Sequence, residues 1–204
     1  MMLKESALKA IGIHEYGLIA TVDIPFEPEV RKICEDNVCR SYGTTWACPP
    51  AVGMVEECRA RCLPYQTAMV FNAVYPLQDS FDYEGMMQGH SAFKDLCDRL
   101  YELVKSQLHE FLLLSNEGCK RCKSCTYPAA PCRQPERLFP SLEGFGIHVA
   151  KLANCANIKY VNGANTVTYF GMLTFCSPPN KGNTAIQLCF AVSYAPETET
   201  PPTV

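Results

Sequence analysis

The sequence predicts an α+β fold in which a mixed sheet is flanked by helices and carries cysteine-rich metal-binding loops. Runs with strand character and runs with helical periodicity follow one another without a regular βαβ alternation. Hydrophobic residues make up 48% and charged residues 19% of the 204 residues, which is typical of a globular protein large enough to bury a core. We expect one cysteine-rich domain over residues 1–194 and a flexible tail, rich in proline and threonine, over residues 195–204.

The first half of the chain contains four short elements and one irregular segment. Apolar runs bounded by proline predict strands, whereas apolar spacings of three and four predict helices. On this basis we expect a strand over 16–23, a short helix over 29–34, an irregular segment over 34–50, a helix over 55–62 and a buried strand over 66–75.

One long predicted helix dominates the second half. Its apolar residues recur at spacings of three and four, Ser91 is a suitable N-cap, and Gly118 follows its end, so we expect a helix over 91–114 after a polar loop over 79–89. Three elements follow: a helix over 143–157, a strand over 166–176 with Gly171 as a bulge, and a last strand over 185–194 that pairs with it as a hairpin.

Four cysteines lie in one short run after this helix. They are Cys119, Cys122, Cys125 and Cys132, in the sequence GCKRCKSCTYPAAPCRQP. The C-x2-C-x2-C spacing supplies three thiolates on a tight loop, as a cuboidal [4Fe–4S] cluster requires. Zinc more often binds two C-x2-C pairs separated by a longer loop. We therefore expect these four cysteines to bind an iron–sulfur cluster, with zinc as the alternative metal.

The residues around these thiols are basic and rich in proline. The basic residues are Lys120, Arg121, Lys123, Arg133 and Arg137. Cations offset the net negative charge of a cluster with four thiolates, and prolines stiffen the loop that carries it. The chain as a whole has a net charge of −3, which argues against a general nucleic-acid surface.

A second group of cysteines lies in the irregular segment. Cys34, Cys39 and Cys48 match no single ferredoxin spacing, but Cys48 precedes Pro49 and Pro50, and ferredoxins use a cysteine followed by proline as a ligand. We expect Cys34, Cys39 and Cys48 to bind a second cluster or metal. The alternative is that they pack as small apolar side chains.

The sequence leaves two questions about the ligands open: which cysteine completes the first group, and which completes the second. Cys48 could complete the cluster of the other cysteine run, as in two-cluster ferredoxins, although Cys132 is favoured because its loop is short and contains proline. Cys58 and Cys62 share one face of a predicted helix, so either of them could complete the second site.

The remaining signals indicate a reduced, cytoplasmic protein. The chain has thirteen cysteines but no recognisable secretory signal or membrane span, so we interpret the cysteines as thiols. Cys97, on the apolar face of the long helix, is expected in the core, and Cys155 and Cys189 are expected to be structural. The sequence contains no Walker, Rossmann or G-x-S-x-G motif, and its histidines lack the spacing of a zinc site.

Three blocks of the sequence resemble a known family. Residues 34–50 match C…C..YG..W.CPP, residues 118–135 match GC..C..C……CR.P, and residues 140–149, PSLEGFGIHV, are similar to P-S-M-E-x-x-G-I-x-V. Over most of residues 30–175 the chain resembles the functionally uncharacterised proteins described as predicted metal-binding proteins, common in anaerobic bacteria and archaea. Leu142 replaces the usual methionine, and His148 stands where an acidic residue is usual. The resemblance implies a metal-binding protein of an anaerobe, with an iron–sulfur cluster as the expected metal group. It implies no particular reaction.

These observations favour an iron–sulfur protein that transfers electrons to a partner or within a redox complex. Whether the chain is itself an oxidoreductase or a redox accessory protein stays open. One alternative is an enzyme whose cluster or second site binds a substrate or a corrinoid, and another is a zinc-stabilised binding module. We expect a redox partner protein, and we expect neither a nucleic acid nor a membrane as a partner.

Overall fold

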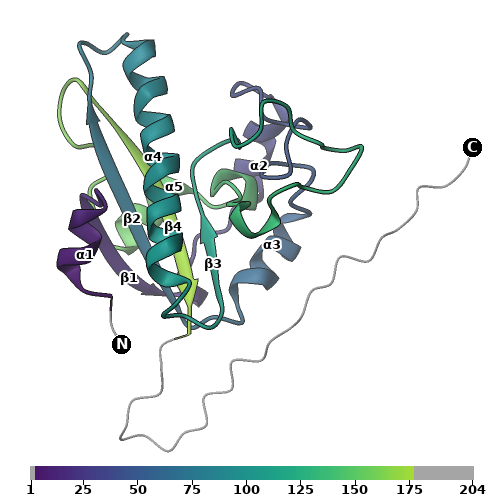
Figure 1. Cartoon of the computed structure of the whole chain (residues 1–204), viewed down its shortest axis with the longest axis horizontal. Helices are drawn as coiled ribbons and strands as arrows, with labels where there is room; N and C mark the ends of the chain where they lie inside the picture. The colour runs from purple at the N-terminus through teal and green to yellow at the C-terminus, as the bar shows by residue number, and fades with distance from the viewer. Residues whose placement is uncertain (1–2, 177–204) are drawn as a thin grey trace, which may run out of the picture.

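The computed structural model describes residues 3–176, which form a four-stranded sheet covered by helices (Figure 1). The strands lie in the order β1-β2-β4-β3, and each neighbouring pair is antiparallel. The elements, in chain order, are α1 (Glu5–Ala10), β1 (Glu15–Ala20), η1 (Thr21–Asp23), α2 (Pro28–Glu35), α3 (Val55–Cys62), β2 (Thr67–Pro76), α4 (Tyr83–Val104), β3 (Phe111–Leu114), η2 (Pro135–Arg137), η3 (Glu143–Phe145), α5 (Val149–Cys155) and β4 (Thr166–Phe175). The α+β class is confirmed, with an antiparallel sheet in place of the expected mixed one.

Both faces of the sheet are buried, which explains why β2 is a continuous apolar run rather than an alternating one. Met69 and Phe71 of β2 pack in one core with α1 and α4, whereas Ala68 and Val70 pack in a second core with α3 and α5. Successive side chains of a strand point to opposite faces, so one strand serves both cores. Figure 1 shows α4 lying along the first of these faces.

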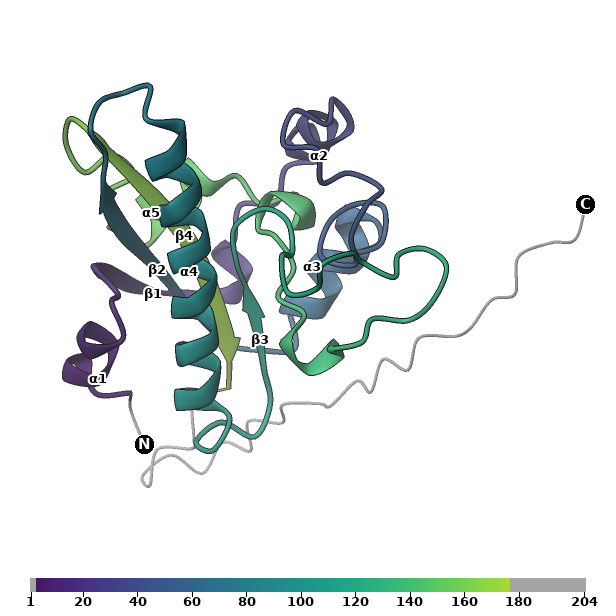
Figure 2. The ribbon, with the colours of Figure 1, turned by 45° about the horizontal axis from the view of Figure 1, so that its top comes forward.

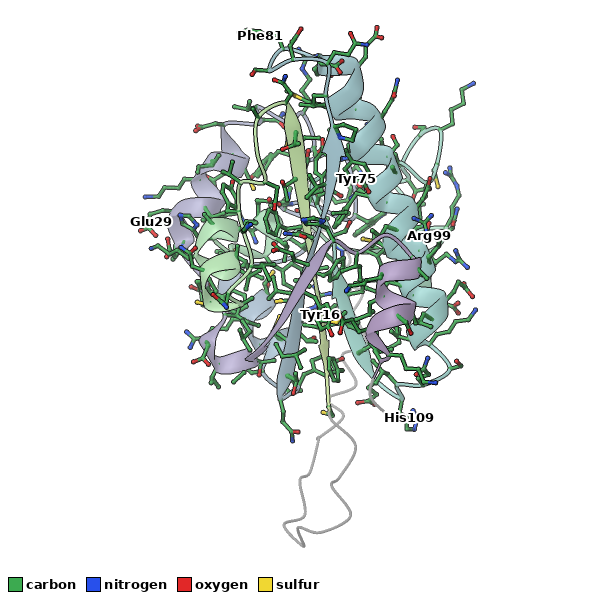
Figure 3. The ribbon with its side chains drawn as sticks, turned by 90° about the vertical axis from the view of Figure 1, so that its left-hand side faces the viewer. Tyr16, Glu29, Tyr75, Phe81, Arg99 and His109 are labelled. Atoms are coloured by element: carbon green, nitrogen blue, oxygen red, sulfur yellow. The ribbon has the colours of Figure 1, made fainter. Side chains whose placement is uncertain are left out.

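Helix α1 was not predicted from the sequence. Leu8 of this helix is buried, Glu5 and Lys9 form an ion pair at 2.7 Å, and Gly12 follows its end with a φ of 101°. Figure 3 shows Arg99 of α4 beside α1, where its guanidinium donates to the carbonyl of Ile11 at 3.1 Å. The i, i+4 charge pair and the glycine were the local signals for this helix.

The shorter predicted elements are confirmed with small shifts in their ends. Helix α3 has the predicted bounds, and β2 lies within one residue of its prediction. Strand β1 ends earlier than expected, because Thr21–Asp23 form the 3-10 turn η1. Residues 36–54 form turns without helix or strand, as predicted for the segment that carries the second group of cysteines.

Helix α4 begins earlier than predicted. The side chain of Asp82 accepts a hydrogen bond from the Gly85 N–H at 2.8 Å and so caps a helix that starts at Tyr83. The second half of the expected loop over 79–89 is therefore helical. Ser91 is not the N-cap but lies inside the helix, where its hydroxyl donates to the carbonyl of Met87.

The same helix also ends earlier than predicted. It stops at Val104. The residues that were expected to form its last turns instead form a turn and then strand β3. Leu108 and Phe111 continue the apolar spacing because they pack against the same core as α4, from the turn and from the strand. The periodicity therefore extends beyond the helix that it was taken to define.

Two predictions for the last third of the described chain need correction. The expected helix over 143–157 is η3 followed by α5, separated by Gly146 with a φ of 77°. Gly171 is not a bulge, because it pairs in register with Phe71 and leaves room for the ring of that residue. The strand and hairpin expected over 185–194 and the tail over 195–204 lie outside the described residues. Within residues 3–176, no helix combines the length and the apolar character that a membrane span requires.

Candidate metal centre

The segment between β3 and η2 carries the first cysteine group, defined as Cys119, Cys122, Cys125 and Cys132. In Figures 1 and 2 this segment lies beside α2 and α3. All four cysteines line one small cavity, which we call the first cavity. Each of them is partly buried and is a free thiol. The other residues that line the first cavity are Thr45, Trp46, Arg121, Thr126, Arg133, Gln134 and Leu138.

Hydrogen-bond donors point at the sulfur atoms of this group. The Gln134 N–H donates to Cys132 Sγ at 3.4 Å. Burial opposes the ionisation of Cys125, but the N–H groups of Tyr127 and Trp46 and the hydroxyl of Thr45 donate to its sulfur and lower its pKa. Metals bind the thiolate, and N–H donors to sulfur stabilise and tune iron–sulfur clusters.

Charged contacts with α4 hold the loop of the first group. Arg121 forms a bidentate pair with Asp98, with N–O distances of 2.8 and 2.6 Å, and its guanidinium lies 4.9 Å from the ring centre of Phe139. Arg137 pairs with Asp98 at 3.6 Å and also with Glu102. A bidentate pair fixes geometry as well as charge, so these two arginines position the loop.

The second cysteine group, defined as Cys34, Cys39 and Cys48, lines a different cavity of about 290 Å³, which we call the second cavity. Cys34 lies in the last turn of α2, Cys39 in the turns that follow, and Cys48 in the segment before α3. Apolar and aromatic side chains form much of the wall: Val30, Ile33, Val38, Tyr42 and Pro49.

Two carboxylates at the second cavity were missed by the sequence analysis. Glu117 follows β3 and Glu143 begins η3, and both line the cavity. The Oε2 atom of Glu143 is buried and accepts no hydrogen bond from any residue of the described chain. Burial raises the pKa of Glu143 to about 7, and Glu117 adds to this effect. Burial also raises the pKa of Cys34 to about 11, with Glu143 as the next cause.

Neither carboxylate stands near the second group in sequence, so spacing gave no signal for them. Glu143 does lie in the PSLEGFGIHV block, which was noticed only through its family resemblance. The fold brings η3 against α2 and so places this block at the cysteines.

Two chain segments, residues 46–48 and 117–119, contribute residues to both cavities, and we call these two segments the partition. In one segment Trp46 lines the first cavity and Cys48 the second. In the other segment Cys119 lines the first cavity and Glu117 the second. The Gly118 N–H donates to Cys48 Sγ at 3.3 Å and joins the two segments.

A lysine from α4 supports this partition. The Lys94 ammonium donates to the carbonyls of Asn116 at 2.7 Å and Gly118 at 2.9 Å, and lies 3.4 Å from the hydroxyl of Ser115. Burial lowers its pKa, while the thiols of Cys48 and Cys119 are among the groups that oppose this shift. Lys94 therefore places a cationic group between the two cysteine groups.

The candidate ligands left open by the sequence lie in different places in the structure. Cys132 lines the first cavity together with Cys119, whereas Cys48 lines the second. Cys58 and Cys62 are fully buried in the core between the sheet and α3, and neither lines the second cavity.

Two further cysteines of the described chain differ in their environment. Cys97 is buried in the core beside α4, as predicted. Cys155 is exposed at the end of α5, so the expectation that it is structural finds no support in its packing. Cys189 lies outside the described residues.

Trp46 also has an unexpected position. It lies two residues before Cys48 of the second group in sequence. Its indole nevertheless lines the first cavity, donates from Nε1 to the carbonyl of Ala130 at 3.1 Å and packs edge-on against Tyr127 with ring centres 4.9 Å apart. Chain neighbours therefore serve different cavities.

Both donor sets fit metal ligation, although neither stands as a closed cage. Within residues 3–176, no three Cys, His, Asp or Glu side chains are already arranged around a common metal position. The first cavity offers four thiols, donors to sulfur and two arginines, which suits an anionic cluster. The second offers three thiols and two carboxyl groups.

Comparison with solved structures finds only weak likeness. A structure of epoxyqueuosine reductase from Bacillus subtilis matches with a TM-score of 0.40 at 10% identity, and epoxyqueuosine reductase with an epoxyqueuosine-modified tRNA-Tyr stem loop matches with 0.38 at 12%. Each match covers 86% of this chain but 45% of the other, so the chain spans less than half the length of these proteins. A likeness of this size supports no inference about function.

Only the comparison with protein families assigns the chain to a family. The search of curated proteins gave no match. The family model described as "Predicted metal-binding protein (DUF2284)" matches residues 17–175, which include both cysteine groups, both cavities and all of the sheet except the first two residues of β1. The chain therefore belongs to this family of predicted metal-binding proteins.

Proposed function

We propose that the protein is a [4Fe–4S] iron–sulfur protein that transfers electrons, with the first cysteine group as the cluster ligands. The observation that carries this proposal is the first cavity itself. Four free thiols from one short loop line it, and no other residue type in its lining is a strong metal ligand. Cuboidal clusters are held by four thiolates, three of them commonly spaced as in this loop.

The charges at the first cavity suit an anionic group that is held by four thiolates. A [4Fe–4S] group with four thiolates is a net anion in both of its usual oxidation states, and nearby cations and N–H donors stabilise it. Arg121 and Arg133 line the cavity, and no carboxylate does. Zinc with four thiolates also carries negative charge, so the metal has to be identified by analysis rather than by charge alone.

The surroundings of the first cavity suit electron transfer more than catalysis. Its lining has neither a histidine nor a carboxylate, so it lacks the usual general acids and bases. The four cysteines are partly exposed, and Lys120 and Lys123 on the same loop are exposed, so a partner can approach the cluster. We infer a redox partner protein with an acidic surface, in a reducing cytoplasm.

The experiment is metal and sulfide analysis of protein purified without oxygen. We expect iron and acid-labile sulfide in equal amounts, roughly four of each for the first cavity, and broad visible absorption that bleaches on reduction. Cys122→Ser should lose the iron and the colour, and Cys155→Ser, at an exposed position outside both cavities, is the matched control.

The same measurement separates the alternatives. Stoichiometric zinc without sulfide would replace this proposal by a zinc-stabilised binding module. An enzyme that binds a corrinoid would need a much larger cavity. The second cavity, at about 290 Å³, lies at the lower limit of ligand pockets, which span roughly 300–1,000 Å³.

A further inference from the structure

We propose that the second cavity is a separate site for a single divalent, thiophilic metal cation of the zinc type, in which Glu143 is a ligand together with Cys34, Cys39 and Cys48. The proposal is independent of the cluster in the first cavity. It assigns different metals to the two cysteine groups, and it gives a role to a carboxylate outside every cysteine motif.

The first argument is convergence. Cys34 comes from α2, Cys39 and Cys48 from the segment before α3, and Glu143 from η3, yet all four line one cavity. Simple core packing of small thiols would not require a carboxyl group to be buried among them.

The second argument is the unsatisfied carboxyl oxygen. Glu143 Oε2 is buried and accepts no hydrogen bond from the residues of the described chain. Leaving a buried polar atom without a partner costs about 1–3 kcal/mol, and more for a charged group. A cation bound at the cavity would provide the missing partner and would offset the charges of Glu143 and the thiolates together.

The third argument is the contrast in charge between the two cavities. Arginines and no carboxylates line the first, whereas Glu117 and Glu143 and no basic residue line the second. An iron–sulfur cluster with thiolate ligands is itself anionic and would be repelled by buried carboxylates. A free divalent cation would be attracted by them.

Two basic side chains near the second cavity form hydrogen bonds with backbone carbonyls. Arg31 donates to the carbonyls of Gly53 at 2.9 Å and of Gly144, while Lys94 donates to carbonyls on the partition. Arg31 is close enough to act electrostatically on Cys34, and Lys94 on Cys48 and Glu143, but neither residue forms part of the lining. The lining of the second cavity therefore contains no cationic side chain.

The donor types select the metal. Soft thiolates favour zinc-like ions, and zinc accepts a carboxylate oxygen as its fourth ligand in a tetrahedral site. Cys34 and Cys48 are on packed segments, whereas Cys39 is exposed in the turn segment between α2 and α3. Cys39 is therefore the donor that moves inward when the metal binds, which is consistent with the absence of a closed set of ligands in residues 3–176.

The test uses cobalt as a spectroscopic substitute for zinc. Purified holoprotein, with its iron and sulfide measured, is treated with a chelator under anaerobic conditions and titrated with Co²⁺. We expect one Co²⁺ per chain, with near-ultraviolet thiolate-to-metal absorption and the visible bands of a tetrahedral site, and no loss of iron. Zn²⁺ should displace the Co²⁺.

Variants then test each ligand. Glu143→Gln keeps the size of the side chain and should weaken Co²⁺ binding by roughly 10–100-fold, the range seen for residues that support metal ligands, or by more. Cys39→Ser should weaken it too, and because Cys39 is exposed this variant should fold even if substitutions at buried Cys48 do not. Cys155→Ser is the control and should bind Co²⁺ normally.

Each contrary outcome overturns a defined part. Absence of Co²⁺ uptake by wild-type holoprotein overturns the second site and leaves the cluster proposal intact. Unchanged Co²⁺ binding by Glu143→Gln removes Glu143 from the ligand set. Loss of both iron and sulfide in Cys39→Ser would show a cluster in the second cavity and overturn the cation proposal. Wild-type protein without iron or sulfide would instead contradict the function proposed for the first cavity.

Discussion

At the scale of single residues, cysteines of the same chain have different environments, and these environments indicate their roles. Cys125 receives several hydrogen bonds at a partly exposed cavity, and its pKa is lowered. Cys97 is enclosed in the core, where burial raises the pKa of its thiol to about 11. Cys125 lines a cavity together with three other thiols, whereas Cys97 packs among apolar side chains and lines neither cavity, so the first is a ligand candidate and the second a packing residue.

Lys94 provides a prediction about the partition between the cavities. Lys94→Met should lower the free energy of unfolding by about 2–3 kcal/mol. The carbonyls of Asn116 and Gly118 would lose hydrogen bonds worth roughly 1.5–3 kcal/mol each, but the cost of burying the ammonium group would be removed as well. Denaturant unfolding of the holoprotein measures this. Lys120→Met is the control, because Lys120 is exposed. Equal stability of the two variants would contradict the supporting role of Lys94.

Trp46 provides a second prediction, because it is the single tryptophan of the chain and lines the first cavity. An iron–sulfur cluster held there should quench its fluorescence. Cys122→Ser, which lacks the cluster, should be brighter than wild type under native conditions, whereas Cys39→Ser at the second cavity should remain dim. If wild-type protein that contains iron is as bright as Cys122→Ser, the cluster does not occupy the first cavity.

At the scale of elements, the contact between β2 and β4 depends on a residue without a side chain. Gly171 pairs with Phe71, and a Cβ atom at Gly171 would clash with the Phe71 ring. That ring stacks on Phe93 of α4 with centres 5.9 Å apart, so it has little freedom to move. Close packing of the sheet on α4 therefore fixes the residue type at this position.

Gly171→Ala should accordingly lower the free energy of unfolding by about 1–3 kcal/mol, the usual cost of overpacking a core. Phe71→Leu removes the ring atoms that would clash, so the double variant should be less destabilised than the sum of the two single variants. Thermal or denaturant unfolding of the four proteins gives this coupling. Additive effects would show that the clash is relieved in another way.

The sequence predicted the elements whose patterns are local. Helix α3, strand β2 and the irregular segment after α2 were found because apolar spacing and prolines define them without reference to the rest of the fold. The ends of α4 could not be found in the same way. Leu108 and Phe111 carry helical spacing because α4, a turn and β3 all pack against one core. Core packing can therefore imitate helical periodicity.

In the candidate site too, the sequence indicated the residues that form local patterns but not those that tertiary structure brings together. The first group could be proposed from its spacing and the second from the prolines after Cys48, and each group does line one cavity. Glu143, Glu117 and Lys94 could not be proposed, since tertiary structure alone brings η3, the end of β3 and α4 to the cysteines. The position of Trp46 could not be inferred from its neighbour Cys48 either, because the two residues of this irregular segment line different cavities.

At the scale of the whole molecule, the sheet with α4 forms a frame, and the cysteine loops lie to one side of it, next to α2 and α3 (Figure 2). The frame is held by two apolar cores. The loops have little regular secondary structure. We expect metal binding to stabilise them, because the free energy of binding contributes to folding when the ligands meet only in the folded state. The two metal sites that we propose therefore lie on this side, separated by the partition.

The most direct test of the central claim is the iron and acid-labile sulfide content of two variants, Cys132→Ser and Cys48→Ser, purified without oxygen beside wild type. Our account predicts that Cys132→Ser loses the cluster of the first cavity, because Cys132 lines that cavity with the other three cysteines. It predicts that Cys48→Ser keeps iron and sulfide at the wild-type level, because Cys48 lines the second cavity. The reverse result, with iron kept in Cys132→Ser and lost in Cys48→Ser, would contradict the assignment of the cluster to the first cysteine group.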